Sequence, residues 1–592
     1  MKRLNRRCGA ISAVTLISLV VSTAGAAQQP GGDDPLVSRR SFYLPMRDGV
    51  RLAVNVYRPA KAGVADAAKA PVVFAFTPYR ARYYDKGKLV DLLDSREFGL
   101  RDLVHAGYVV ATADIRGKGA SFGARRGFLD QTEAKDGAEI VQWLARQPYA
   151  SGDVGLIGCS YLGGTAMLVA GAAPPAVKAV FSAATDWDKY EFVSRGGITG
   201  QFNTRPEEST SIDLASVPVD ADAGGVLLKQ AVAQHAGNTP MAPLWYGIPY
   251  RDSVSALTGT RFWEEVGPYT RKAALARPGV AWYLWGNWND EPTEQIIRSA
   301  ANLPAKMIIG PGSHCEPPKQ FNINTIQKSF FDRYLKGIRN GVDTEPKYAW
   351  WRQDGSGGEL IRSNDLPGVG VKRTTLLLSA GPGIKAGTLG AKASGDGRTD
   401  YPIDYDISTD AYFPFWPDSP DARAALFTTP PLAGPATIEG YSIVSIRAAA
   451  DGPQANMFAY LEDVDPDGKA VVLAQGRLAA SHRKLSKPPY NDLDLPYHSG
   501  LGRDAEPLVP GAPVTLVFDL SPRSYVVPAH HRLRVALAGA DPRQRNLAAI
   551  RNRLATRWTI YGGAVGSRID IPFKTPARFE AGTEQKTVGE AK

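Results

Sequence analysis

A serine between closely spaced glycines is the first feature of this sequence that could do chemistry. Ser160 lies in the segment GCSYLGG, residues 158–164, between a predicted strand and a predicted helix. A sharp strand-to-helix turn exposes a serine hydroxyl above a sheet, and free N–H groups at the helix start favour a developing negative charge. The usual pattern is G-x-S-x-G, but Leu162 stands at the second glycine position and Gly163 comes one place later. The context predicts a nucleophilic serine, although a glycine-flanked serine alone is common.

A serine nucleophile needs a histidine base and an acid that orients the histidine, and in this kind of turn they follow in the order serine, acid, histidine. Of the seven histidines, His314 lies in the loop just after the predicted strand 306–309, and Asp290 lies just past the predicted strand 281–285. Catalytic residues of parallel sheets gather at the carboxyl ends of the strands, so both positions fit. Two plainer interpretations stay open: His314 as a hydrogen-bonded loop residue, and Asp290 as the N-cap of a helix over 291–300.

The elements that must position these residues are expected to form an α/β domain with a mostly parallel sheet. Short apolar strands alternate with helices, as in sheets that are covered on both faces. After a hairpin over 41–57, we expect strands at 72–76, 108–114, 154–158, 177–183, 281–285 and 306–309, and helices at 92–103, 133–146, 160–172 and 326–336.

Residues 186–280 interrupt this alternation and are predicted to be an inserted helical cap, with helical segments near 223–236 and 251–257. The α/β-hydrolase catalytic domain is therefore expected over 35–185 and 281–360. After residue 366 the chain changes to short β-like segments separated by turns rich in Gly, Pro and Asp. That spacing predicts a C-terminal β-sandwich or jelly-roll domain over 366–578.

The first 26 residues have the pattern of an export signal. Four basic residues among the first seven precede an apolar segment over 10–21 and then Ala24-Gly25-Ala26, which predicts cleavage before Ala27. A membrane anchor is the alternative, but the apolar segment is shorter than the roughly 20 residues of a span. We expect an exported protein, periplasmic or secreted, without stable membrane insertion.

Composition limits the partners. The chain of 592 residues has a net charge of +10, of which four positive charges lie in the predicted signal. The remaining basic residues are interspersed with acidic ones, so no nucleic-acid partner is expected. We expect a small-molecule ester or amide, or a short peptide, as substrate, and no metal or cofactor; a homo-oligomer is left open.

Several segments together resemble the CocE/NonD group of serine hydrolases, which is related to X-Pro dipeptidyl-peptidases. The group includes cocaine esterase, α-amino-acid ester hydrolases and glutaryl-7-aminocephalosporanic acid acylases. The similarity runs from about Phe42 to Ile571. The matching segments are MRDGVRL (46–52), TPY (77–79), DIRGKGAS (114–121), GCSYLG (158–163), WND (288–290), GPGSH (310–314) and FDRYLKG (331–337).

The resemblance implies roles for five residues. Ser160 matches the nucleophile, His314 the base and Asp290 the acid of a catalytic triad. Tyr79 matches a tyrosine whose hydroxyl donates to the oxyanion together with the backbone N–H of Tyr161; by itself Tyr79 also fits a turn residue. The resemblance also implies a helical cap and a C-terminal jelly roll of the galactose-binding type. Within the matched WND segment, Trp288 is the candidate substrate contact.

Departures from the group concern the substrate pocket. The group often has Trp at position 312, where this chain has Gly312, and Gly at position 315, where it has Cys315. In α-amino-acid ester hydrolases, carboxylates two and three residues after the acid bind the substrate ammonium. Here those positions are Pro292 and Thr293, and only Glu291 is adjacent, which counts against that subgroup.

Two cysteines directly flank the catalytic candidates. Cys159 precedes Ser160, and Cys315 follows His314. If the serine and the histidine meet, the two cysteines come close, so we hypothesise a disulfide beside the site. Two free thiols in the unfolded, unreduced protein would contradict it.

The sequence thus predicts a serine hydrolase that cleaves an ester or amide bond through an acyl-enzyme. X-Pro dipeptidyl-peptidase or β-lactam acylase activity is the alternative among enzymes. A ligand- or glycan-binding protein with an inactive hydrolase fold is the alternative outside them. Substrate identity and the choice between ester and peptide stay open.

Overall fold

A computed structural model describes residues 34–200, 209–381, 383, 387–393, 396–406, 416–541, 543 and 554–580. The chain from Pro35 onward forms one compact unit. The predicted signal over 1–26 lies outside the described residues. No helix in these ranges is both long enough and apolar enough to cross a bilayer.

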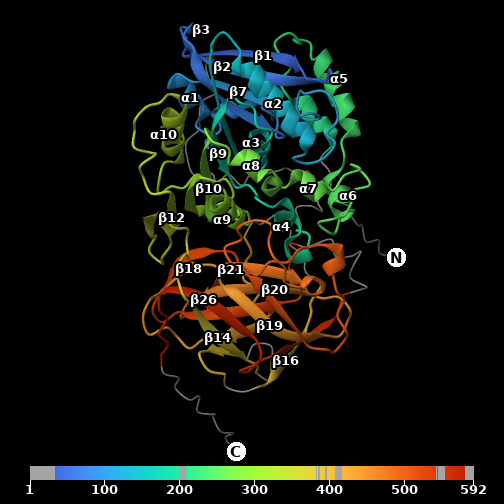
Figure 1. Ribbon diagram of the computed structural model, residues 1–592, viewed down its shortest axis with the longest axis vertical. Helices are drawn as coiled ribbons and strands as arrows, with labels where there is room; N and C mark the ends of the chain where they lie inside the picture. Colours follow the sequence, from blue (N-terminus) through green and yellow to red (C-terminus); the bar gives the residue numbers. More distant parts are fainter. Residues whose placement is uncertain are drawn as a thin grey trace, which may run out of the picture. The chain divides into compact units, whose positions relative to one another are not determined.

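Eleven strands of the described chain form the first sheet (Figure 1). Its order is β1-β2-β7-β4-β8-β9-β10-β11-β12-β13, with β3 paired to β2. The strands from β7 to β12 in this order run parallel, whereas β1, β2 and β13 pair antiparallel at the two edges. Their bounds are β1 (Val37–Pro45), β2 (Arg51–Lys61), β3 (Val64–Ala65), β4 (Ala70–Thr77), β7 (Val109–Asp114), β8 (Ala150–Cys159), β9 (Val177–Ala183), β10 (Ala281–Asn289), β11 (Ala305–Ser313), β12 (Tyr348–Arg352) and β13 (Glu359–Ser363). The α/β prediction is confirmed.

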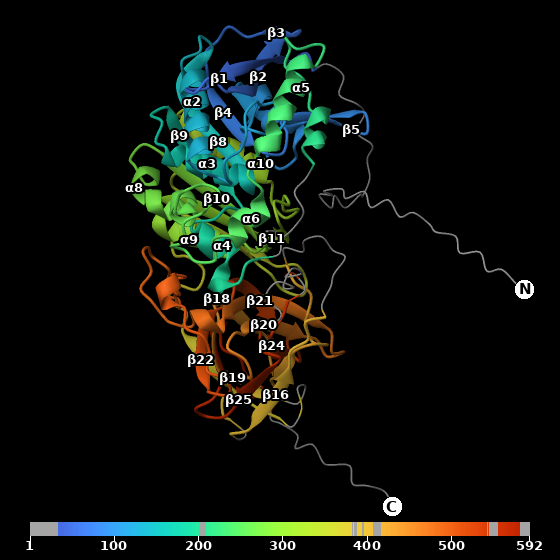
Figure 2. The same ribbon diagram turned by 90° about the vertical axis from the view of Figure 1, so that its right-hand side faces the viewer.

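Helices cover both faces of this sheet, as the continuously apolar strands require (Figures 1 and 2). Along β4, Phe74 and Phe76 belong to one apolar cluster and Val73 to another, because successive side chains of a strand point to opposite faces. The Phe74 cluster includes residues of α2 and α3, and the Val73 cluster includes residues of α1 and α10. The helices are α1 (Leu100–His105), α2 (Gln131–Ala145), α3 (Tyr161–Gly171), α9 (Thr293–Asn302) and α10 (Ile323–Leu335).

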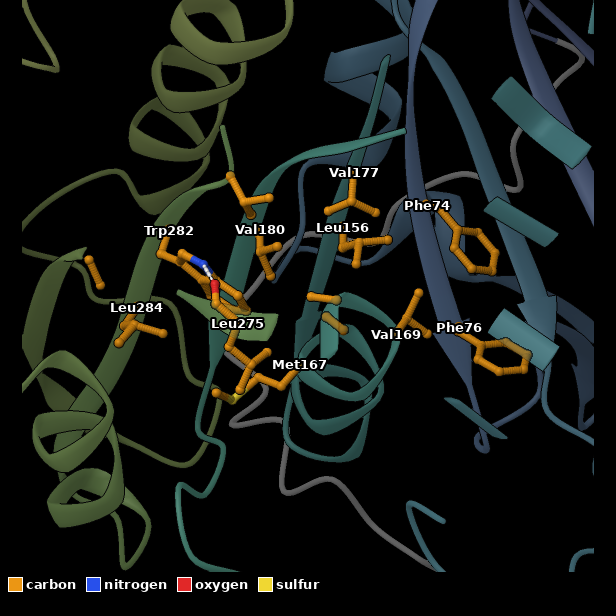
Figure 3. Packing of buried hydrophobic residues seen from close by; sticks show 14 of the residues in the cluster. Phe74, Phe76, Leu156, Met167, Val169, Val177, Val180, Leu275, Trp282 and Leu284 are labelled. Carbon is orange, nitrogen blue, oxygen red and sulfur yellow. Dashed lines mark hydrogen bonds between the residues drawn. The ribbon is translucent and has the colours of Figure 1, made fainter. Parts of the chain in front are cut away.

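Figure 3 shows the packing of the first cluster. Met167 and Val169 of α3 lie beside Leu156 of β8. The Trp282 indole N–H at the start of β10 donates to the Leu275 carbonyl at 2.9 Å. Helix α3, which follows Ser160, is thus fixed against the sheet by buried apolar contacts.

Two predicted helices differ from the structure. The helix expected at 92–103 is a 3-10 turn, η1 (Leu92–Asp94), followed by the short α1, and Gly99 between them has a left-handed φ of 51°. Residues 251–257 form turns instead of a helix. There the Arg251 N–H donates to the Gly500 carbonyl, and the Ser255 N–H donates to the Thr260 carbonyl. A helix would bond the Ser255 N–H to the Arg251 carbonyl, and this local turn uses that N–H instead.

The segment between β9 and β10 consists of short helices in its described part. They are α4 (Lys189–Val193), η2 (Arg195–Gly197), η4 (Thr210–Ala215), α5 (Val226–Gln234), η5 (His235–Gly237), α6 (Met241–Tyr246), α7 (Phe262–Val266), η6 (Pro268–Arg271) and α8 (Lys272–Leu275). A separate apolar cluster containing Tyr190, Trp245 and Trp263 holds α4, α6 and α7 together. The sequence analysis missed the hairpin of β5 (Arg82–Asp85) and β6 (Lys88–Asp91), which follows Tyr79.

The C-terminal part is rich in β-strands and encloses an apolar core of its own. Its pairings are antiparallel except for the parallel contact of β15 with β17. The strands are β14 (Arg373–Ser379), β15 (Gly387–Gly390), β16 (Arg398–Pro402), β17 (Ala425–Thr428), β18 (Ala436–Gly440), β19 (Ile443–Ala450), β20 (Asn456–Val464), β21 (Ala470–Ala479), β22 (Val514–Asp519), β23 (Arg523–Val527), β24 (Arg532–Ala538), β25 (Arg557–Tyr561) and β26 (Arg568–Thr575).

Candidate active site

Ser160 occupies a sharp turn between β8 and α3. Its φ of 61° and ψ of −129° are unusual for a residue with a side chain. The Ser160 N–H donates to the Ala183 carbonyl at the end of β9, at 2.9 Å. The neighbouring strand therefore holds the turn in its strained conformation, which is the arrangement that presents a serine hydroxyl beyond the carboxyl end of a parallel sheet.

The glycine pattern around this turn has a steric cause. A Cβ on Gly158 would lie 2.3 Å from the Leu162 carbonyl, and a Cβ on Gly163 would lie 2.4 Å from the Ala183 carbonyl. Both positions therefore exclude a side chain. Leu162, which stands at the usual glycine position, instead places its side chain in the apolar core. The second glycine is needed one place later because that is where α3 approaches β9.

Asp290 and His314 meet at the ends of two adjacent parallel strands. In the register of β10 and β11, Asn289 is paired with Ser313. The next residues are Asp290 and His314, and His314 Nδ1 lies 3.0 Å from each Asp290 carboxylate oxygen. Asp290 is 1% exposed. Burial raises its pKa above the ordinary value, while the nearby His314 partly opposes that shift.

Asp290 does not cap the helix that follows it. Helix α9 begins at Thr293, and its N-cap position is occupied by Pro292, which makes no side-chain cap hydrogen bond. The Asp290 backbone carbonyl accepts from the Thr293 N–H at 3.2 Å. The carboxylate is therefore left to face the imidazole, the arrangement that can orient the ring and stabilise its cationic form.

Asn287 fixes the loop that carries His314, and the sequence analysis missed it. Its Nδ2 donates to the Ser313 carbonyl at 2.6 Å and to the Glu316 carbonyl at 2.9 Å. The residue is 1% exposed. Asn287 thus holds the chain on both sides of the histidine. Its place in the GNWND segment, three residues before Asp290, was the one available signal.

A disulfide joins Cys159 to Cys315, with their Cα atoms 6.0 Å apart. The bond links the residue before Ser160 to the residue after His314. It joins residues 156 positions apart in the sequence. It also links the ends of β8 and β11, which β9 and β10 separate in the sheet.

Tyr79 reaches the serine from the end of β4. Its hydroxyl lies 3.4 Å from Ser160 Oγ, and the residue is 52% exposed. Tyr161 begins α3, so its backbone N–H belongs to the first turn, whose N–H groups have no intrahelical acceptor. The Tyr79 O–H lies near the serine hydroxyl, and the Tyr161 N–H belongs to the residue that follows the serine. A pair of such donors can stabilise an oxyanion.

The Tyr161 side chain itself points into the protein. Its hydroxyl donates to Glu133 Oε1 at 2.7 Å and accepts from the Leu129 N–H at 3.1 Å. Burial raises the Glu133 pKa to about 8, nearby Asp130 adds to the rise, and the bond from Tyr161 opposes it. This buried pair anchors the first residue of α3.

Trp288 lies in the core and not on a substrate-facing surface. It is 1% exposed, and its indole N–H donates to the Trp351 carbonyl at 2.5 Å. The structure therefore gives no support to Trp288 as a substrate contact.

Glu291 is engaged by arginines. Arg477 Nη1 donates to its carboxylate at 2.5 Å, and Arg543 Nη1 lies 4.0 Å away. Burial raises the Glu291 pKa, but Arg477 and Arg543 outweigh that effect and hold it below its ordinary value. This carboxylate is therefore committed to a structural ion pair and is not free to hold a substrate amine.

Comparison with known proteins relates the chain to one group of hydrolases. The family model for X-Pro dipeptidyl-peptidase (S15 family) matches residues 48–316. The model for the X-Pro dipeptidyl-peptidase C-terminal non-catalytic domain matches residues 340–547. A Mycobacterium bovis protein named "Putative serine esterase" is 28% identical over 90% of this chain and 95% of its own length. Cocaine esterase from a Rhodococcus species is 25% identical over 76% of this chain and 84% of its own length.

A solved structure supports the fold. A CocE/NonD family hydrolase from Staphylococcus aureus aligns with a TM-score of 0.68 at 19% identity, covering 90% of this chain and 93% of that one.

Proposed function

We propose that the chain is a serine hydrolase of the X-Pro dipeptidyl-peptidase (S15) family, in its CocE/NonD group, and that Ser160, His314 and Asp290 are its catalytic triad. In this proposal the substrate is a small ester or amide. A short peptide is the second candidate because Xaa-Pro dipeptidyl-peptidases are among the relatives, such as that of Lacticaseibacillus paracasei at 24% identity over 76% of this chain.

The proposed reaction has two halves. Ser160 Oγ attacks the substrate carbonyl while His314 takes its proton and then gives it to the leaving group. Asp290 orients the imidazole and stabilises its charge. The Tyr79 hydroxyl and the Tyr161 N–H donate to the oxyanion. Water, activated by His314, then releases the acyl group from the serine.

One observation carries this proposal: the buried carboxylate of Asp290 contacts His314. Asp290 follows β10, and His314 follows the neighbouring parallel strand β11. Asp290 has both oxygens 3.0 Å from Nδ1. The Cys159–Cys315 disulfide links the residue before Ser160 to the residue after His314. A binding protein with an inactive hydrolase fold would not require the carboxylate, the histidine and the serine turn to lie together.

The surroundings of Asp290 favour an ester or amide without a free ammonium group over a dipeptide. A dipeptidyl-peptidase holds its substrate amine with a carboxylate, whereas Glu291 is paired with Arg477. The next two residues are Pro292 and Thr293, which carry no charge.

Turnover of p-nitrophenyl esters, compared with aminoacyl-p-nitroanilides, tests the proposal. We expect ester hydrolysis by the wild type and a loss of roughly 10⁴-fold or more in Ser160→Ala and His314→Ala. Ser356→Ala, at an exposed turn, is the matched control and should keep full activity. Equal rates in Ser160→Ala and wild type would refute the assignment.

We also propose a domain layout and a cellular location for the protein, both of which rest on the sequence pattern. The catalytic domain comprises 35–185 and 281–360, the cap 186–280 and the β domain 366–578. The protein is exported, periplasmic or secreted, after loss of residues 1–26. The Cys159–Cys315 disulfide supports export, because such bonds persist in oxidising compartments.

A further inference from the structure

A buried arginine lies beside the proposed triad without an acidic partner. Arg523 is the first residue of β23 and is 4% exposed. Its Nη1 donates to Asn289 Oδ1 at 2.8 Å. Its buried Nε has no hydrogen-bond partner, and across the described ranges no carboxylate lies within 4.0 Å of the guanidinium.

Four other buried arginines of the described residues each have a close carboxylate partner. Carboxylates lie 2.5–2.7 Å from them: Glu294 for Arg195, Asp188 for Arg251, Asp492 for Arg298 and Glu291 for Arg477. A buried charge without a counter-ion is costly, and buried donors are normally bonded. Burial lowers the pKa of Arg523 to about 10, which reflects that cost. Arg523 therefore needs an explanation that the fold alone does not give.

The position of Arg523 relates it to the site. Asn289, which holds the guanidinium, directly precedes Asp290 and is paired in register with Ser313, the residue before His314. The guanidinium is thus fixed at the carboxyl ends of β10 and β11, where the proposed acid and base lie. The Tyr525 and Trp416 rings lie 6.0 and 5.6 Å from its centre, so aromatic surfaces and not anions surround it.

We propose that Arg523 is a specificity residue that binds a carboxylate carried by the substrate, away from the bond that is cleaved. An arginine fork matches a carboxylate in geometry, and an anion that reaches it would satisfy the unpaired Nε and supply the missing counter-charge. The inference rests on the proposed function and names its substrate class: esters or amides with a second, free carboxyl group.

Matched ester pairs test this selectivity. The probes are p-nitrophenyl hemiesters of succinate, glutarate and adipate, each compared with its methyl-capped neutral counterpart. We expect wild type to favour at least one hemiester, and Arg523→Gln to lose about 10- to 100-fold of kcat/KM for that hemiester while the neutral ester changes little. Arg523→Lys should keep part of the preference. Arg503→Gln, at an exposed arginine of the same domain, is the control and should keep all of it.

Binding without turnover separates this proposal from the mechanism. In the Ser160→Ala background, the same free dicarboxylates should raise the melting temperature, and Arg523→Gln should abolish that shift. An equal loss for neutral and anionic esters in Arg523→Gln would make Arg523 a structural residue and overturn the proposal. So would the absence of any hemiester preference and of any dicarboxylate shift. Loss of ester turnover together with a retained dicarboxylate shift would contradict the proposed function alone.

Discussion

At the scale of single residues, chain order predicted more than local pattern did. Ser160 alone was one glycine-flanked serine, and Asp290 and His314 became candidates because each follows a strand in the order that such a turn requires. The structure brings Asp290 and His314 into contact. Asn287 and Arg523 were not predicted, because their partners belong to loops or strands that are distant in the sequence.

The Tyr79 hydroxyl offers a direct residue-scale prediction. Tyr79→Phe removes the phenol donor 3.4 Å from Ser160 Oγ and leaves the ring. Because we propose that this donor acts on the oxyanion and not on the ground state, we expect kcat to fall by roughly 10²-fold while KM changes little. Steady-state kinetics with a neutral p-nitrophenyl ester measure this effect. Tyr84→Phe, at an exposed tyrosine of the following hairpin, is the control. A rise in KM with kcat unchanged would assign Tyr79 to ground-state binding.

At the scale of elements, periodicity predicted the strands and the long helices but not the breaks. The helix expected at 92–103 is interrupted at Gly99, where the backbone turns left-handed. The segment 251–257 is held by contacts to the β domain and to its own turn, which no local pattern reports. The two-glycine spacing around Ser160, by contrast, follows from the close approach of α3 to β9.

The disulfide should stabilise the elements that carry the serine and the histidine. Its loop of 156 positions is long, so the chain-entropy model gives an upper value of roughly 5 kcal/mol. We expect the Cys159→Ala/Cys315→Ala double variant, and wild type reduced under native conditions, to melt at lower temperature. Calorimetry with and without reductant measures the difference. An unchanged melting temperature in both the double variant and the reduced wild type would show that the bond contributes nothing to stability.

The buried Glu133 below α3 predicts a pH dependence of stability. Its pKa is raised to about 8 by burial, so the folded protein holds this proton more tightly than the unfolded chain. That contribution to stability is complete below the ordinary value of 4.5 and is lost as the pH rises towards about 8. Glu133→Gln has no such proton and keeps an acceptor for Tyr161.

The melting temperature of Glu133→Gln minus that of wild type should therefore increase between about pH 4.5 and pH 8 and then level off. Thermal melts across this range measure it. If the melting temperatures of Glu133→Gln and wild type differed by the same amount at pH 5 and at pH 8, Glu133 would be ionised throughout this range.

At the scale of the whole molecule, the sequence predicted a catalytic α/β part and a β-rich part but not how they are joined. Buried ion pairs connect them, including Arg195 with Asp519 at 3.1 Å and Arg298 with Asp492 at 2.5 Å. Charged residues are usually exposed, so composition gave no reason to place these in the interior. Arg523 has no such carboxylate partner among the described residues, and the substrate carboxylate that we propose would supply one.

Export is a prediction about the whole chain. If residues 1–26 are a cleaved signal, the mature protein should begin at Ala27 and appear in the periplasm or medium of a bacterial host. N-terminal sequencing of the purified protein measures this, with a chain that starts at residue 27 as the control retained in the cytoplasm. An intact N-terminus on exported protein would favour the anchor interpretation.

The most direct test of the central claim is covalent labelling of the serine. A fluorophosphonate probe reacts with an activated serine hydroxyl, and peptide mapping locates the adduct. We predict one label on wild type, at Ser160, no label on Ser160→Ala, and greatly slowed labelling of His314→Ala because the base is missing. Labelling that persists in Ser160→Ala, or an unlabelled and folded wild type, would contradict the triad.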